Sequence, residues 1–312
     1  SCCCASSAAT TLSSLLWILC AASMPVYNDT NGMPRDGDGR VLHLGLTDGE
    51  LANRIVVVGH IARAELLAQF LEPEEPESQV FRLASDRGFT TFTGFFKGVK
   101  VSVISMGMGL AMMDFAVREA RAIVEGPMVM VRFGTCGVLQ ESAGVGGVGV
   151  ASGGSILVQR NYAAFQGNTK KDGVDAHIIT DVVLPDAALT EATQASLVEE
   201  LGSAAVKSGI NVTADSFYGS QGRNDPAFID DNSSLVEEVL KRHPTALTME
   251  METFQLFHLA RCCDPAGAIR AAAVAALVAN RPTGEVVEAD KLKATERDGG
   301  RAILRAVATV SL

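Results

Sequence analysis

The stretch Arg54-Ile-Val-Val-Val-Gly59 decides the fold, because four apolar residues in a row, all of them β-branched, predict a strand that is buried on both faces. A helical pattern follows at once over residues 62–71. The alternation continues, with strands predicted over residues 89–95, 100–106, 128–133, 211–214 and 268–278, and helices over residues 112–124, 188–208, 234–242, 252–262 and 290–310. We therefore expect an α/β fold, a single domain in which helices flank a central mixed, mostly parallel β-sheet on both faces.

The composition narrows the classes of partner. The chain has 312 residues, 47% of them hydrophobic, and a formal net charge of -10. This acidity argues against nucleic acid or an anionic membrane as a partner, because both are bound mainly through clustered Lys and Arg. Four of the seven cysteines lie in the first twenty residues, and the other three show no metal-binding spacing. We expect a reducing, cytoplasmic setting and no metal.

The first 40 residues differ from the rest of the chain. Residues 1–23 carry no charge, and their apolar run over residues 15–22 is too short to span a bilayer and lacks the basic region of a secretory signal. A degenerate signal peptide is the alternative. We expect a leader and irregular arm over residues 1–40, in which 1–23 are non-structural and Met24 is the natural start. The folded domain is predicted over residues 41–312.

Two arginines stand in positions suited to an anion. Gly59 ends a strand and Arg63 lies in the first turn of the next helix, where backbone N–H groups and a guanidinium can converge. The alternative for Arg63 is a surface arginine beside a tight turn. Arg132 lies inside an apolar run, so it must meet a carboxylate or a ligand, and we favour the ligand. Its segment, Arg132-Phe-Gly-Thr-Cys-Gly137, is predicted as a strand that ends in a glycine-rich turn.

Two further segments suit a nucleoside. Asp215-Ser-Phe-Tyr-Gly-Ser-Gln-Gly-Arg223 groups an aromatic ring with a glutamine and an arginine just beyond a short strand, a set that can hold a planar base with amide groups. Glu250-Met-Glu252 offers carboxylates, and one ionised carboxylate can accept hydrogen bonds from both hydroxyls of a ribose diol. The alternative for these acids is helix capping.

Two other patterns in the sequence do not indicate a functional site. The segment Gly144-Val-Gly-Gly-Val-Gly149 matches a dinucleotide fingerprint, but residues 150–158 read as a turn and a strand where that fingerprint requires a helix. Cys136 has no His or Asn partner in a neighbouring motif. We therefore interpret it as a small buried residue and not as a nucleophile.

Five separated motifs together resemble the uridine phosphorylases of the nucleoside phosphorylase family, from about residue 41 to the C-terminus. The motifs are Leu42-His-Leu-Gly-Leu-Thr47, Leu83-Ala-Ser-Asp-Arg-Gly-Phe-Thr-Thr91, Arg132-Phe-Gly-Thr-Cys-Gly137, Ser216-Phe-Tyr-Gly-Ser-Gln-Gly-Arg223 and Met249-Glu-Met-Glu252. Each would be weak alone, but their order and spacing agree with the family. The resemblance implies the family's three-layer fold.

The same resemblance implies an active site with three parts. Its residues would be Gly59, Arg63, Arg132 and Thr135 for phosphate, with Arg87 from a neighbouring subunit; Met251, Glu252 and a supporting Glu250 for ribose, with His43 from across the interface; and Phe217, Gln221, Arg223 and Arg281 for the base. The catalytic residues would be Arg223, Gln221, Arg132 and Glu252. Arg281 stands where purine-specific relatives usually place a general-acid aspartate, which favours a pyrimidine.

The implied reaction is the reversible phosphorolysis of uridine to uracil and α-D-ribose 1-phosphate in pyrimidine salvage. The enzyme would be a pentosyltransferase with no cofactor and inorganic phosphate as co-substrate, acting as a homo-oligomer with a dimer as its minimal unit. The alternatives are a purine nucleoside or methylthioadenosine phosphorylase and a catalytically silent nucleoside-binding homologue. Two departures stand out: His60-Ile61 replaces a frequent Asp-Pro, and Gly88 replaces a glutamate with which bacterial relatives hold a monovalent cation. That ion is not expected here.

Overall fold

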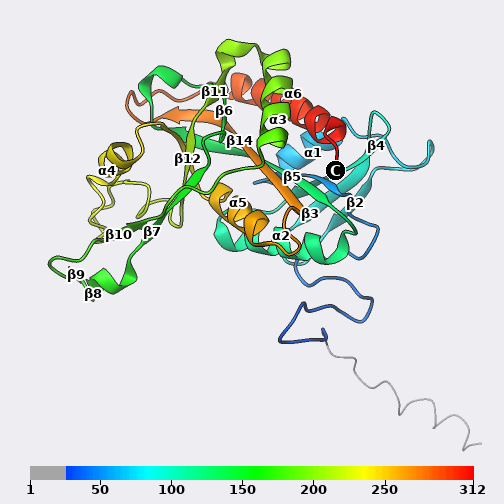
Figure 1. Ribbon diagram of the computed structural model, residues 1–312, viewed down its shortest axis with the longest axis horizontal. Coiled ribbons are helices and arrows are strands. Elements are labelled where there is room, and N and C mark those ends of the chain that lie inside the picture. Colours follow the sequence, from blue (N-terminus) through cyan, green and yellow to red (C-terminus); the bar gives the residue numbers. More distant parts are fainter. Residues whose placement is uncertain (1–25) are drawn as a thin grey trace, which may run out of the picture.

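The computed structural model describes residues 26–312, which form a three-layer arrangement of helices, sheet and helices (Figure 1). The strands are β1 (Arg54–Val58), β2 (Phe81–Ala84), β3 (Thr90–Phe96), β4 (Val99–Ser105), β5 (Met128–Val138), β6 (Val148–Val150), β7 (Ser155–Arg160), β8 (Phe165–Gln166), β9 (Thr169–Lys170), β10 (His177–Ile179), β11 (Val206–Ser208), β12 (Ile210–Ala214), β13 (Ala246–Glu250) and β14 (Ile269–Asn280). The helices are α1 (Ile61–Ala68), α2 (Leu110–Ile123), α3 (Ala187–Leu201), α4 (Leu235–Arg242), α5 (Thr253–Cys262) and α6 (Ala289–Thr309).

The central sheet of the described chain has twelve strands, in the order β10-β7-β12-β13-β5-β1-β4-β3-β2, with β14 beside β5 and β6, and β11 beside β6. Its middle is parallel: β1 pairs with β4 and β5, and β5 also pairs with β14. Its edges are antiparallel, as in β2–β3–β4 and β7–β10. The predicted α/β fold with a mixed sheet is confirmed.

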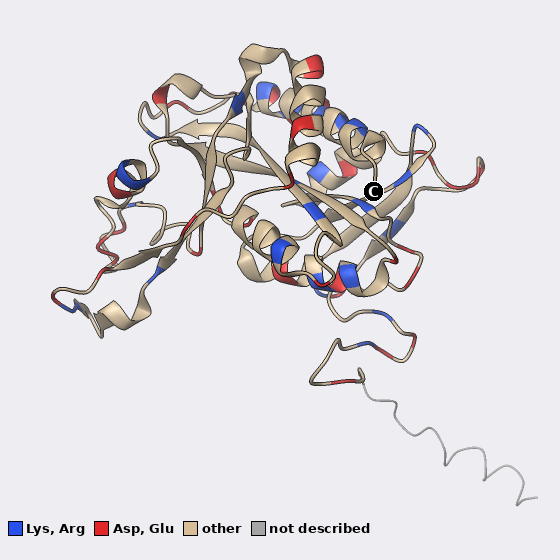
Figure 2. Cartoon of the chain, viewed as in Figure 1, with Lys and Arg blue, Asp and Glu red and all other residues tan. Residues whose placement is uncertain are grey.

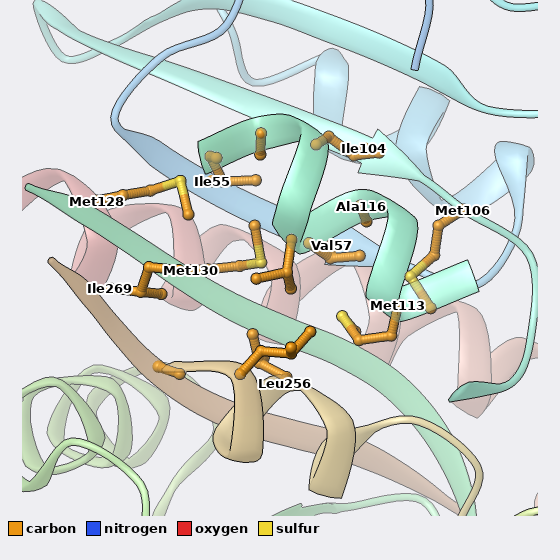
Figure 3. Close-up of a cluster of buried hydrophobic side chains, with 14 of the residues drawn as sticks. Ile55, Val57, Ile104, Met106, Met113, Ala116, Met128, Met130, Leu256 and Ile269 are labelled. Carbon is orange, nitrogen blue, oxygen red and sulfur yellow. The ribbon is translucent and has the colours of Figure 1, made fainter. Parts of the chain in front are cut away.

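Two apolar clusters hold the layers together. On one face, α2 and α5 pack against the sheet through buried side chains such as Ile55, Met113, Met130 and Leu256 (Figure 3). On the other face, α1, α3 and α6 cover a second cluster that includes Phe133. Each such side chain contributes roughly 1.5–3 kcal/mol when it is fully buried. Because β1 and β5 are covered on both faces, they carry the near-continuous apolar runs that the sequence shows.

A smaller cluster forms a side lobe. Here α4 packs on β7, β12 and β13, and the short hairpin β8–β9 projects beyond it (Figure 1). Charged residues of both signs lie mainly on helices and loops, while the central strands are largely uncharged (Figure 2). No helix within residues 26–312 combines the length and apolar character needed to cross a membrane.

The described part of the N-terminal arm is irregular, as predicted. Isolated bridges join Arg35 to Asn28 and to Val41, and the Arg35 guanidinium donates to the carbonyl of Ala122 at the end of α2 over 2.7 Å. The arm is therefore tied to the domain by hydrogen bonds and by Met33, which packs against the apolar cluster under α2 and α5. The predictions for residues 1–23 lie outside the described residues.

Several predicted element boundaries are wrong; the helix predicted over residues 62–71, for example, ends at Ala68. β5 does not end in a turn after Phe133 but continues to Val138, because Gly134 and Gly137 stay in the ladder opposite β14. The helix predicted over residues 188–208 ends at Leu201, and β11 follows over Val206–Ser208. By contrast, the glycines of residues 144–149 lead into the strand β6, which confirms that they do not open a dinucleotide-binding helix.

Candidate active site

A cavity of about 360 Å³ gathers most of the predicted site residues. It lies where β1, β12, β13 and β14 end, at the carboxyl edge of the parallel part of the sheet, which is where such sheets bind ligands. Ten predicted residues line it, namely Gly59, Arg63, Arg132, Thr135, Phe217, Gln221, Arg223, Glu250, Met251 and Glu252. Positions up to 193 residues apart in sequence are thus brought together by the fold.

Arg132 lies at the centre of the site and contacts two carboxylates. Its Nη2 is 3.1 Å from Glu250 Oε2 and donates to Glu252 Oε2, so the guanidinium meets acids of this chain, which the sequence left as one of two possibilities. Its Nη1 is buried without a hydrogen-bond partner among the described residues, so one donor remains for a ligand. Burial lowers the pKa of Arg132, but the two carboxylates outweigh it and the net pKa is raised.

Gly134 gives the Arg132 side chain its place. The two residues point to the same face of β5 because side chains alternate along a strand. A Cβ at Gly134 would lie only 1.7 Å from Arg132 Nη1, so the guanidinium occupies the space of a missing side chain. The glycine that was interpreted as part of a turn therefore serves the geometry of the site from within a strand.

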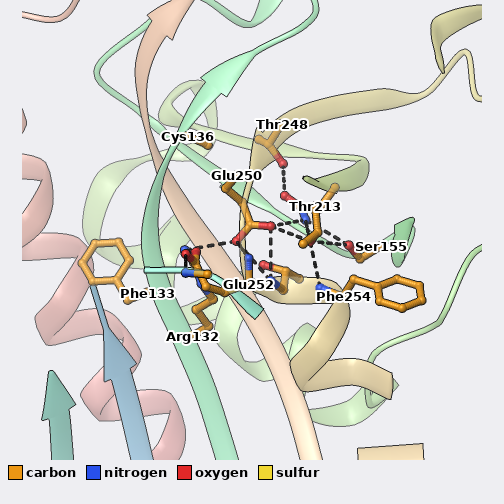
Figure 4. A network of polar contacts seen from close by, with 12 residues as sticks. Arg132, Phe133, Cys136, Ser155, Thr213, Thr248, Glu250, Glu252 and Phe254 are labelled. Carbon is orange, nitrogen blue, oxygen red and sulfur yellow. Dashed lines mark hydrogen bonds and ion pairs between the residues drawn. The ribbon is translucent and has the colours of Figure 1, made fainter. Parts of the chain in front are cut away.

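Glu250 is the hub of the buried polar network (Figure 4). Its Oε1 accepts hydrogen bonds from Asn211 Nδ2 at 2.8 Å and Thr213 Oγ1 at 2.6 Å, both on the neighbouring strand β12. Its Oε2 accepts from the backbone N–H groups of Glu252 at 3.0 Å and Thr253 at 3.1 Å, where α5 begins. The capping alternative is therefore correct for Glu250. Burial raises its pKa, but Arg132 and these donors outweigh burial and the net pKa is lowered.

Glu252 turns its carboxylate toward the cavity side of the network. Its Oε1 accepts from the backbone N–H of Gly109 at 2.6 Å and its Oε2 accepts from Arg132. Burial, opposed by Arg132 and reinforced by Glu250, raises the pKa of Glu252. Two carboxylates that share one guanidinium are thus unequal, and Glu252 is the one with spare acceptor capacity next to the cavity.

Arg63 forms the other cationic corner. Its side chain is buried, which rules out the surface alternative. The Nε and Nη2 atoms donate to Glu296 Oε1 at 3.0 and 2.6 Å, Nη1 donates to the carbonyl of Phe133, and the guanidinium lies 5.5 Å from the Phe133 ring centroid. Glu296 on α6 was missed, since nothing in the sequence distinguishes it from a surface acid of an amphipathic helix. Cys136 also lines the cavity, and burial raises the pKa of its thiol, which fits an inert residue.

The segment 215–223 forms the outer wall of the cavity. The Arg223 guanidinium stacks over the Phe217 ring at 3.5 Å from its centroid and donates to the Phe217 carbonyl and to Gln221 Oε1. Burial and the nearby Arg281 lower the pKa of Arg223 to about 10. Arg281 itself donates to the backbone carbonyls of Gln221 and Gly222 and supports this wall from outside.

Asn232 is a second residue that sequence reasoning missed. Its Nδ2 lies within hydrogen-bond distance of the carbonyls of Tyr218, Gly219 and Arg223, at 3.1, 2.9 and 3.1 Å. A buried asparagine thereby fixes the curve of the outer wall. Only the general preference of Asn for irregular backbone could have pointed to it.

Three predicted residues do not line the cavity: Arg281, which supports the outer wall from outside, and Arg87 and His43, which were expected to come from a partner. Arg87 is exposed in the turn between β2 and β3. His43 stacks on Phe115, with ring centroids 3.8 Å apart, and its Nδ1 lies 2.6 Å from Glu119 Oε1. Because both were expected to serve a neighbouring subunit, their places in one chain neither support nor contradict that role.

The chain matches the family model described as Phosphorylase superfamily over residues 53–310. A uridine phosphorylase of Thermococcus kodakarensis is 28% identical over 84% of this chain and 85% of its own length. A DeoD-type purine nucleoside phosphorylase of Oceanobacillus iheyensis is 31% identical over 70% of this chain and 80% of its own.

Solved structures agree with these relatives. One, from work on two diverse uridine phosphorylases of the oomycete Phytophthora capsici, superimposes with a TM-score of 0.86 at 42% identity, covering 92% of this chain and 100% of its own. The predicted class of enzyme, a pentosyltransferase, fits the family. The resemblance drawn from the motifs is confirmed, and the chain belongs to the phosphorylase superfamily.

Proposed function

We propose that this protein is a uridine phosphorylase, which converts uridine and phosphate reversibly to uracil and α-D-ribose 1-phosphate in pyrimidine salvage. One observation carries the proposal: a single cavity is lined by two buried arginines, by two carboxylates that contact one of these arginines, and by an aromatic ring with Gln221 and Arg223. These three groups suit the phosphate, the ribose and the base of one substrate complex. The 42% identity to a structure from work on uridine phosphorylases supports the choice of base.

The phosphate is proposed to bind at the inner end, against Arg63, Arg132 and Thr135, with the backbone of Gly59 close by. The free Nη1 of Arg132 supplies a donor that has no partner among residues 26–312. Phosphate is its own nucleophile, so the protein has only to place it below the anomeric carbon of the sugar. Positioning of two reactants can supply roughly 7–11 kcal/mol of the barrier.

The departing base is proposed to be stabilised at the outer wall. As the glycosidic bond breaks, negative charge moves onto uracil, and donors from Arg223 and Gln221 strengthen with that charge. Phe217 would cover the sugar and base, and Arg281, which holds the carbonyls of Gln221 and Gly222, would keep the wall in place. The reaction needs no cofactor and no metal in this scheme.

The ribose is proposed to sit between the two ends, on Glu252 and Met251, with Glu250 in support. Glu252 can accept from ribose hydroxyls while Glu250, whose oxygens already accept from four donors at 2.6–3.1 Å, keeps Arg132 and the start of α5 fixed. Glu252→Gln should therefore impair ribosides more than 2′-deoxyribosides. Equal losses of kcat/KM for uridine and 2′-deoxyuridine would remove Glu252 from this role.

The test of the proposed function is release of free base from a panel of nucleosides, with and without phosphate. We expect phosphate-dependent release of uracil from uridine, with inosine and adenosine poorer by about 10⁴ or more, because a site that pairs with polar groups of one base rejects bases that lack them. Uridine turnover without phosphate, or no turnover of any nucleoside, would contradict phosphorolysis; the second result would favour a silent nucleoside-binding protein.

A purine nucleoside phosphorylase is the second candidate, because a relative of that kind is 31% identical over 70% of the chain. The groups at the outer wall oppose it. Arg281 stands where purine-specific relatives usually place a general-acid aspartate, and a guanidinium holds its proton far more tightly than a carboxylic acid does. Equal rates on inosine and uridine in the same panel would favour the purine reading.

The assembly is proposed to be a homo-oligomer whose minimal unit is a dimer with shared sites, to which Arg87 and His43 are donated by the partner. Arg223 is only partly buried and is expected to tolerate substitution, so Arg87→Ala and Arg223→Ala make a suitable pair. When the two variants are refolded together, half of the dimers should be hybrids. In each hybrid, one site carries both substitutions and the other carries neither, so roughly a quarter of all sites should recover activity. No recovery, with hybrids confirmed by different tags, would show that Arg87 serves its own chain.

A further inference from the structure

His60 lies in the same corner of the cavity as Arg63, yet none of the proposed roles uses it. It is the N-cap residue of α1, and its side chain lines the cavity with 54% of its surface exposed. A capping role alone would need only the atom that faces the helix. The other ring nitrogen is therefore available for a second task.

The cap fixes the orientation and the proton of the ring. The backbone N–H of Arg63 donates to His60 Nδ1 over 3.3 Å, and the Arg63 guanidinium also points a donor at Nε2. A neutral ring accepts at only one nitrogen, so with the cap formed the proton is on Nε2, and the contact with Arg63 then joins two donors that need an acceptor between them. This Nε2 lies 3.3 Å from Arg63 Nη2 and 4.0 Å from Glu296 Oε1. Two donor atoms of different side chains thus stand side by side. An anion oxygen that bonds to one of them is within reach of the other.

The charges of this corner favour a further cation. Around the inner end of the cavity, Arg63 and Arg132 face three carboxylates, Glu250, Glu252 and Glu296. A phosphate brought there adds more negative charge. Arg132 Nη1, buried and without a partner in the described chain, independently indicates that an anion belongs in this corner.

We propose that His60 is a phosphate-binding residue whose Nε2–H donates to an oxygen shared with Arg63, and that protonation of its ring tightens the binding of phosphate. This inference rests on the proposed phosphorolysis, which supplies the phosphate. The charged groups that face the ring are Arg63 from its own helix and Glu296 from α6. A bound dianion would be the third.

The direction of the pH effect follows from these neighbours. Burial and, next, Arg63 lower the pKa of His60, so the ring is neutral near pH 7 before phosphate binds. A bound dianion stabilises the imidazolium and raises that pKa, so binding takes up a proton. Affinity for a dianion should then increase as the pH falls through the pKa of the complex, and should level off below the pKa of the free ring.

Sulfate is the probe of choice, because it remains a dianion while phosphate itself titrates. We would measure sulfate binding by calorimetry in the full chain at about pH 8 and about pH 5.5, a range that spans the titration of histidine. In the unmodified protein, affinity should rise about tenfold toward the lower pH. Uridine phosphorolysis, inhibited by sulfate in competition with phosphate, gives a second readout.

Two variants separate capping, hydrogen bonding and titration. His60→Asn keeps a good N-cap but is too short to reach Arg63 Nη2, so its melting temperature should stay close to that of the unmodified protein, while sulfate affinity near pH 6 falls about tenfold and no longer depends on pH. His60→Gln keeps an amide donor without a titrating proton. It should retain affinity at pH 8 and lose only the increase at low pH.

The outcomes distinguish this inference from the proposed function. Sulfate affinity in His60→Asn within about twofold of the unmodified protein at both pH values would overturn the role of His60, and phosphate-dependent release of uracil would leave the function standing. Sulfate binding that depends on His60, without phosphorolysis of any nucleoside, would support the anion corner and overturn the function.

Discussion

The two ends of the cavity are built in different ways. At the inner end, Arg132, Glu250 and Glu252 belong to strands and a helix start, and none of these residues is more than 6% exposed. At the outer wall, Phe217 is 45% exposed, and Arg223 is held by the Phe217 ring face, the Phe217 carbonyl and the Gln221 side chain. The inner end is part of the core of the fold, whereas the outer wall is attached to it.

This difference predicts which substitutions can change binding or catalysis without changing the stability of the fold. A buried ion pair that loses one partner leaves a charge without compensation, which typically costs 3–5 kcal/mol, while a change in a half-exposed loop alters binding with little effect on folding. Chemistry and stability should therefore be lost together at the inner end. At the outer wall they should separate, and selectivity for the base can vary without unfolding the enzyme.

The largest effect is expected for Arg132→Met. The change leaves Glu250 and Glu252 facing each other in a buried site, so the free energy of unfolding should fall by roughly 3–5 kcal/mol at pH 7. Without the arginine the folded chain holds both carboxyl protons more tightly than the unfolded chain does. The loss should therefore shrink as the pH is lowered toward about 5.

Denaturant unfolding at several pH values measures the Arg132→Met effect. The matched control is the double variant Arg132→Met, Glu252→Gln, which removes one of the two facing charges and should recover part of the stability at pH 7. A loss below about 1 kcal/mol, or a loss that does not depend on pH, would contradict the view that this end is a folding element.

Arg223→Ala should act on catalysis alone. Loss of a hydrogen bond to a charged leaving group weakens transition-state binding by roughly 1.5–3 kcal/mol, which is about ten- to a hundredfold in kcat/KM for uridine. The free energy of unfolding should change by less than about 0.5 kcal/mol. Steady-state kinetics beside denaturant unfolding tests the separation, and a matching loss of stability would erase the contrast between the two ends.

Gly134→Ala should destabilise the inner end of the cavity through the single methyl group that it adds. The new Cβ would overlap Arg132 Nη1, which lies 1.7 Å from its position, and such overpacking costs about 1–3 kcal/mol. Gly137→Ala is the control on the same strand, because the nearest atom to its Cβ would be 3.6 Å away. The melting temperature should fall for the first variant and not for the second. Equal shifts in the melting temperatures of the two variants would show that the Arg132 side chain can move away from the added methyl group without cost.

Phe217→Leu should have the smallest effect. The variant keeps an apolar side chain but removes the ring face under Arg223, an interaction worth about 0.5–1 kcal/mol at an exposed site. KM for uridine should rise about two- to fivefold, with the KM for phosphate and the melting temperature unchanged. A rise in the phosphate KM of the same size would mean that the outer wall and the phosphate corner are coupled.

Much of the fold was readable from local sequence. The apolar run of β1 and the helix after it could be predicted because burial on both faces leaves no polar alternation to obscure the pattern. β5 could be followed only to Phe133, since Gly134 and Gly137 have the same signature in a turn as in a strand that leaves space for a neighbouring side chain. That space belongs to Arg132 and is visible only in three dimensions.

The sequence predicted which residue types form the site, but not which of these residues contact one another. The need of Arg132 for a carboxylate or a ligand follows from its apolar neighbours, but its partners Glu250 and Glu252 lie 118 and 120 residues farther along the chain. Glu296 carried no signal at all, because a helix residue is assigned to a buried or exposed face by its period, and a buried acid contradicts that rule. Asn232 was hidden in an irregular loop for a similar reason.

The pairing of Arg63 with Glu296 also bears on how the enzyme is made. These residues are 233 positions apart, and the α6 helix that carries Glu296 packs on α1 and β1. A nascent chain that has emerged only as far as α5 lacks β14, which pairs with β5 in the middle of the sheet, and also lacks α6. The corner proposed to bind phosphate then has an arginine without a counter-ion. Contacts between such distant segments form late and slowly. Competence to bind phosphate should therefore appear as one of the last events in biosynthesis, after α6 has left the ribosome.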